Sequence, residues 1–143
     1  MAFVHGKNTI FKLDDSGGTL RDLSAYLNNV DFPRDQNVPE TTTFGVAGGS
    51  RTYLTGLNSA TITVAGQYDS TATSGPDVVL SGLINAATTA TFEYGPEGGS
   101  SGKVKYTGEA LLTSYQTSSS VDGVCTFSGA LQITGQVTRT TFP

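Results

Sequence analysis

The residues that could carry chemistry in this chain are few and far apart. A nucleophilic triad needs a base beside its serine or cysteine, and the only histidine, His5, lies in a segment that predicts an ordinary N-terminal arm. The only cysteine, Cys125, shares the apolar side of a predicted strand with Phe127, so we expect it to pack as a small hydrophobic residue. One cysteine and one histidine also exclude an internal disulfide and a histidine metal cluster.

Two further patterns resemble functional sites and fail on inspection. Residues 95–103 read GPEGGSSGK, but a phosphate-binding P-loop would need glycine and serine or threonine where Glu97 and Val104 stand. Glu93, Glu97 and Glu109 could supply a glycosidase carboxylate pair, yet the chain has no tryptophan as a sugar platform. Solvent-facing acids explain these glutamates equally well, so the sequence predicts no catalytic residue, no cofactor and no metal.

The elements that hold these residues are predominantly strands. Apolar and small polar residues alternate with period two in five stretches, which is typical of half-buried strands: 9–13, 60–68, 89–94, 103–112 and 124–138. Leu111 and Tyr115 break the alternation of their strand, which indicates a bulge or a second buried surface. Residues 76–87 instead follow a helical period, with Pro76 suited to the first helical position. A short helical turn is expected near residues 23–27.

The length and the strand count predict one domain over residues 1–143. We expect an all-β sandwich or barrel of about seven or eight strands with one packed helix. Glycine, serine and threonine make up 54 of the 143 residues, whereas charged residues are only 14%, against roughly 25% in an average domain. Strand faces this poor in charge favour contact with other copies of the chain over exposure to water.

The charge distribution restricts the partners. The net charge is −4, which argues against a protein that grips nucleic acid through its phosphates. The longest apolar run is about four residues, so neither a membrane-spanning helix nor a secretory signal is expected. Residues 52–102 contain no lysine or arginine but four acids, namely Asp69, Asp77, Glu93 and Glu97. Facing the centre of a closed ring, these acids would repel DNA and let it pass.

Several phrases of the sequence, in order, give it a family resemblance. TTTFG begins at Thr41, ATITVAGQYD at Ala60, FEYGPEG at Phe92 and LQITGQVTR at Leu131. Together with DLSAYLNNVDFPRD, which begins at Asp22, they carry a resemblance that spans roughly residues 20–143. The chain resembles the major tail proteins, or tail tube proteins, of long-tailed, non-contractile bacteriophages.

The resemblance implies a structural role in the virion. It implies a β-sandwich or barrel flanked by a helix, rings of six subunits stacked into a hollow tube, and a conduit for ejection of the DNA genome. A long loop after the second strand, together with N- and C-terminal arms, would join one ring to the next. The implied partners are further copies of the chain, a tape-measure protein and a tail terminator, with no membrane and no specific DNA contact. The protein would lie in the host cytoplasm before assembly.

Carried onto this sequence, the resemblance assigns residues to ring stacking. The long loop corresponds to residues 40–57 and the C-terminal arm to residues 135–143. The expected interface residues are Thr43, Phe44, Gly45, Arg51, Tyr53, Leu54, Arg139 and Phe142. The four acids of residues 52–102 are the candidates for the lumen.

Two other readings stay open at this stage. The tube of a contractile phage tail or of a type VI secretion-like machine would share the fold, and a neighbouring sheath gene would distinguish it. A secreted β-sandwich that binds carbohydrate or a cell surface fits the threonine- and glycine-rich composition, although no signal, tryptophan or disulfide supports it. An enzyme is the least supported class.

Overall fold

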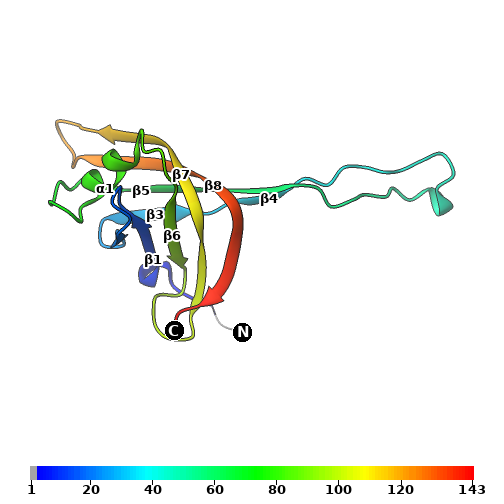
Figure 1. Ribbon diagram of the computed structural model, residues 1–143, viewed down its shortest axis with the longest axis horizontal. Coiled ribbons are helices and arrows are strands. Elements are labelled where there is room, and N and C mark those ends of the chain that lie inside the picture. The colour runs from blue at the N-terminus through cyan, green and yellow to red at the C-terminus, as the bar shows by residue number, and fades with distance from the viewer. Residues whose placement is uncertain (1–2) are drawn as a thin grey trace.

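The computed structural model describes residues 3–143, which form eight strands, one α-helix and two short 3-10 helices (Figure 1). The predicted N-terminal arm begins with residues 1–2, which lie outside the described residues. The elements are, in chain order, η1 (Gly6–Asn8), β1 (Ile10–Asp14), β2 (Leu20–Asp22), β3 (Leu27–Asp31), β4 (Arg34–Gln36), η2 (Ala47–Gly49), β5 (Asn58–Gln67), α1 (Pro76–Leu83), β6 (Ala90–Gly95), β7 (Val104–Ser118) and β8 (Thr126–Thr141).

The strands form one antiparallel sheet with the order β2-β1-β6-β7-β8-β5-β3, and β4 pairs with β5 beside β3. The long strands β7 and β8 bend along their length, so the sheet curls around its own inner face (Figure 1). The strand count and the single helix confirm the predicted all-β class. The predicted sandwich or barrel is realised as a single sheet that curls.

The core fills the inside of this curl. Alternate residues of β1, of β5 and of the first half of β8 are buried, as the period-two pattern predicts. On β5, for example, Ile62 and Val64 are wholly buried while Thr63 between them is exposed. Phe11 on β1 and Phe92 on β6 complete the centre. Each such side chain stabilises the fold by about 1.5–3 kcal/mol, so the sheet and its core form together.

The irregularity predicted in β7 is confirmed as a bulge. The register with β8 shifts between Leu112 and Ser114, because Thr113 has no directly paired residue. The extra residue reverses which residues of β7, odd or even, face the core. Tyr115 therefore turns toward the core side and packs at an interplanar angle of 56° against Phe127, while Leu111 stays 42% exposed on the outer face.

Helix α1 is shorter than predicted. It begins with Pro76 at the first position and buries Val79, Leu80 and Leu83, as the sequence indicates. It ends at Leu83 instead of residue 87, because Asn85 adopts a left-handed φ of 69° that stops the helix. The helical turn expected near residues 23–27 is a turn over residues 24–26, after which β3 begins.

The C-terminal segment differs from the expectation. Residues 135–143 were expected to leave the domain as an arm, but residues 135–141 belong to β8. After a register shift at residues 135–137, residues 138–141 pair with residues 104–107 of β7. Gly135, at φ 83°, permits the local bend that keeps β8 on its partner. Phe142 is 7% exposed and its N–H donates to the carbonyl of Lys103 at 2.9 Å. In this structure the segment is therefore part of the sheet, because residues 138–141 pair with the start of β7.

The most distinctive feature is a long projection between β4 and β5. Residues 37–57, which we call the extension, leave the body as two narrow, side-by-side segments of coil joined at the far end (Figure 1). The predicted loop at residues 40–57 lies within it, although four strands precede it instead of two.

Candidate assembly surfaces

The two groups considered for nucleophilic chemistry, His5 and Cys125, are both exposed. His5 accepts the N–H of Lys7 on its Nδ1 at 3.1 Å and so caps η1. The expectation that Cys125 packs in the core is wrong: it is exposed, because β8 and its alternation begin one residue later, at Thr126. Across the same residues, no three of the potential metal ligands gather closely enough to hold an ion. None of their helices has the length and apolar character to cross a membrane.

The extension is held straight by its own hydrogen bonds. The N–H of Thr41 donates to the carbonyl of Thr52 at 2.8 Å, and the N–H of Leu54 donates to the carbonyl of Pro39 at 2.9 Å. Glu40 and Tyr53 form an isolated bridge, and Arg51 lies 3.6 Å from Glu40 as an exposed ion pair. The two arms of the extension are therefore ordered before any partner arrives, which lowers the entropy lost on binding.

The extension exposes large apolar side chains along its length. Phe44 near its end is fully exposed, Leu57 is 86% exposed and Leu54 is 61% exposed. Val38 and Tyr53 are about half exposed. No core exists in the extension to receive them, and large apolar groups gathered on one projecting element mark an interaction site.

The structure brings six of the eight predicted interface residues together. They are the residues on the extension: Thr43, Phe44, Gly45, Arg51, Tyr53 and Leu54. Arg139 lies apart, on β8 opposite Tyr106 of β7. Phe142 packs within its own chain, beneath the ammonium of Lys105 at 5.4 Å, so it does not offer a free apolar side chain.

The four acids expected in the lumen do not share one place. Asp69 and Asp77 lie together beside the start of α1, where the N–H of Asp77 donates to the carbonyl of Asp69 at 3.4 Å. Glu97 lies in the connection from β6 to β7, which is at the end of the body near the C-terminus (Figure 1). Glu93 lies on β6 between Lys12 and Thr107, its register partners on the two neighbouring strands.

One of these acids anchors the helix to the sheet. The hydroxyl of Tyr115 on β7 donates to Asp77 at 2.9 Å, and that of Ser81 donates to the same carboxylate at 3.2 Å. Burial, and then the hydrogen bond to Asp77, raise the pKa of Tyr115 well above its usual value. The tyrosine therefore keeps its proton and remains a donor at neutral pH.

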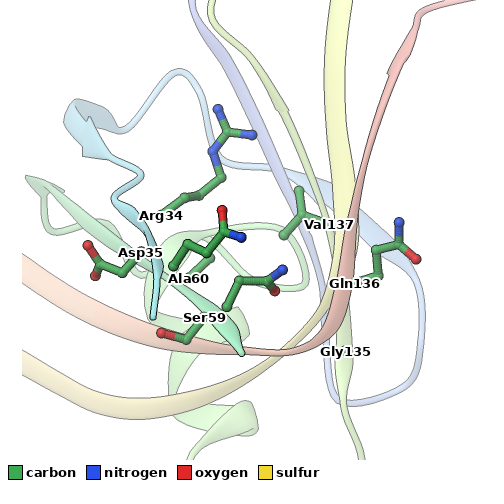
Figure 2. A pocket seen from close by; sticks show the side chains of 9 residues that line it. Arg34, Asp35, Ser59, Ala60, Gly135, Gln136 and Val137 are labelled. Carbon is green, nitrogen blue, oxygen red and sulfur yellow. The ribbon is translucent and has the colours of Figure 1, made fainter. Parts of the chain in front are cut away.

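An open groove of about 490 Å³ lies at the base of the extension (Figure 2). It forms because β5 and β8 pair only as far as Thr61 and Gln132, after which β8 follows β7 and β5 runs on beside β4. Residues 58–60 of β5 thus have no strand on the side that faces β8. The amide of Gln132 spans the opening by donating to the carbonyl of Ala60 at 3.1 Å.

Arg34 stands at one wall of this groove. Its guanidinium lies 4.8 Å from the ring centroid of Tyr106 and 5.4 Å from that of Phe32. These distances are those of cation–π contacts, and no hydrogen bond joins the guanidinium N–H groups to another residue of the described chain, residues 3–143. No sequence pattern indicates this site, because the groove depends on where β5 and β8 separate.

The fold and these surfaces define a structural β domain, with exposed groups suited to contacts between chains. The family model for phage tail tube proteins matches residues 3–139. The chain therefore belongs to the phage tail tube protein family, which supports a structural and non-enzymatic role and confirms the resemblance found in the sequence.

Solved structures of tail and tube assemblies have the same fold. The tail of an empty gene transfer agent particle, refined with C6 symmetry, matches with a TM-score of 0.81 at 20% identity, over 97% of this chain and 100% of that one. The SPP1 tail tube matches with a TM-score of 0.74 at 12% identity, over 97% of this chain and 80% of that one. A sheath–tube complex of an extracellular contractile injection system matches with a TM-score of 0.69 at 13% identity, over 97% of this chain and 92% of that one. No curated protein sequence matches the chain.

Proposed function

We propose that this tail tube protein polymerises as stacked rings of six subunits, and that the resulting tube conducts genome DNA out of the virion. The observation that carries the proposal is the extension: a straight, hydrogen-bonded projection that exposes Phe44, Leu54 and Leu57 in a member of the tail tube family. The C6 symmetry of the similar gene transfer agent tail supports the ring number.

The extension is suited to joining one ring to the next. It projects well beyond the body (Figure 1), so its end reaches a neighbouring subunit while its base stays in its own. Burying its large apolar side chains on the neighbour supplies the favourable free energy, and few such anchors usually dominate an interface. The exposed pair of Arg51 and Glu40 adds little in water and serves orientation.

The tube wall acts on DNA by repulsion. The net charge of −4 recurs in every subunit, and the stretch from residue 52 to residue 102 contains acids without any base. A lumen lined by some of these acids would keep the polyanion from binding to the wall. A tape-measure protein inside the tube and a terminator at its end complete the assembly, and subunits wait in the host cytoplasm until they are incorporated into the virion.

A tube within a contractile machine is the second candidate. The fold of this chain is nearly as similar to the tube of a contractile injection system, with a TM-score of 0.69, as to the SPP1 tail tube at 0.74. A gene for a sheath protein beside the gene for this chain would favour the contractile machine, and its absence would favour the non-contractile tail.

Negative-stain electron microscopy of the concentrated protein tests the proposal. We expect rings or tubes from the intact chain, and folded monomers from a chain that lacks residues 44–53. Circular dichroism provides the control, because the deleted residues contribute nothing to the core and the melting temperature should be unchanged. Tubes of normal length from the deletion, or dispersed monomers from the intact chain at every concentration, would refute it.

A further inference from the structure

The groove and the extension lie at the same end of the body, and the turn between β7 and β8 lies at the opposite end (Figure 1). We call this turn, residues 119–125, the tip. When identical subunits stack head to tail, the surface at one end of a subunit always meets the opposite end of the next. Stacking along the extension therefore brings the tip of one copy toward the groove of another.

The groove presents an unpaired cation, Arg34, and also an exposed carboxylate, Asp35, that forms no ion pair with it. The ion pairs of residues 3–143 are Arg21 with Asp15 and Arg51 with Glu40, so Arg34 has no carboxylate partner within that part of its own chain. Figure 2 shows Arg34 rising from β4 on one side of the groove, with Gln136 and Val137 on β8 at the other. A guanidinium held on aromatic rings, with its N–H groups free, is preorganised to bind a carboxylate through two parallel hydrogen bonds.

The tip presents the complementary groups. Asp122 is exposed, and its carboxylate forms no hydrogen bond or ion pair with residues 3–143. Val121 beside it is fully exposed and Val124 is 68% exposed. These side chains have nothing to pack against in their own subunit.

Other acids at that end of the body are already engaged. Asp69 accepts hydrogen bonds from the N–H and the hydroxyl of Thr71, and Asp77 accepts them from Tyr115 and Ser81. Asp122 is left as the carboxylate at this end that is free to bind a partner.

Resting on the ring stacking proposed above, we propose that the tip of one copy seats in the groove of a copy in the adjacent ring, with Asp122 bound to Arg34. Val121 then contacts the apolar part of the groove at Val137 and Ala60. This contact is separate from the one made by the extension, and it sets the register of one ring on the next, because a paired charge fixes orientation more than affinity.

Charge reversal tests this contact. The single variants Arg34→Asp and Asp122→Arg, and the double variant with both changes, are assembled at a series of concentrations. The critical concentration for tubes is then measured by sedimentation and electron microscopy. We expect each single variant to raise the critical concentration at least tenfold and the double variant to return to within about threefold of the intact chain.

A matched control separates the specific pair from net charge. The double variant Lys7→Asp with Asp122→Arg has the same net charge of −4 as the intact chain and as the test double variant. It should assemble as poorly as Asp122→Arg alone. Asp122 lies in an exposed turn, so Asp122→Arg should fold normally. This holds even if Arg34→Asp disturbs the packing of Phe32 and Tyr106, on which Arg34 lies.

The outcomes distinguish the contact from the stacking itself. Tubes from the intact chain with recovery only in the reversed pair support the contact. Tubes from the intact chain together with normal assembly of Asp122→Arg, or with no recovery in a reversed pair whose thermal unfolding matches that of the intact chain, overturn the contact alone. An intact chain that never assembles overturns the stacking and the contact with it.

Discussion

Replacing Phe44 by alanine should weaken tube assembly without affecting the fold. The side chain is fully exposed in the free subunit, so its removal takes nothing from the core and leaves the free energy of unfolding unchanged. In the tube, each subunit would bury one such phenylalanine on a neighbour, worth about 1.5–3 kcal/mol. Each 1.4 kcal/mol of lost binding free energy raises a dissociation constant tenfold, so the critical concentration should rise by about 10- to 100-fold.

Sedimentation of tubes over a dilution series measures this concentration directly. Phe44→Leu serves as the matched control, because it keeps a large apolar side chain at the same position. Its critical concentration for assembly should rise less than tenfold. Thermal unfolding of both variants should coincide with that of the intact chain. An unchanged critical concentration for Phe44→Ala would show that the end of the extension is not buried on a neighbour, and the reasoning would be refuted.

Three further changes test the fold and the lumen. Gly66→Ala should destabilise the subunit by about 1–3 kcal/mol in urea unfolding, since its Cβ would overlap the carbonyl oxygen of Tyr26, whereas Gly45→Ala, with open space around it, should be neutral. Tyr115, whose folded pKa is raised, stabilises the fold below about pH 10 and loses that contribution as the pH rises further, so Tyr115→Phe should flatten the alkaline decline of stability. Glu93→Lys should slow DNA ejection without blocking assembly; unchanged ejection kinetics would count against a lumenal position.

The sequence predicted the elements well where local pattern determines structure. The alternation around Ile62 and Val64 identified a strand because every second residue must face the core. The break at Leu111 and Tyr115 predicted a bulge or a second buried surface, and the structure has the bulge, in which one extra residue reverses the faces of β7. Pro76 marked the start of the helix.

The errors arose where partners distant in the sequence decide the outcome. Residues 135–141 were expected to be an arm, but the full length of β7 is available to pair with them, and no local signal gives the length of a partner strand. Cys125 continued an apolar pattern by type, yet it precedes the first paired residue of β8 and is exposed.

The candidate surfaces divide in the same way. The extension was predicted through the family resemblance, and its apolar residues Phe44, Tyr53 and Leu54 are exposed together. The groove beside Arg34 could not be predicted, because it exists only where β5 and β8 separate after Gln132. The stacking roles of the extension and of Arg139 remain predictions.

A helical reconstruction by electron cryo-microscopy of tubes grown from the purified chain tests the central claim most directly. It would show where residues 37–57 of each subunit lie. The account predicts that they run onto a subunit of the adjacent ring, with Phe44 buried there. Tubes in which the extension points into solvent or contacts only its own ring would contradict it.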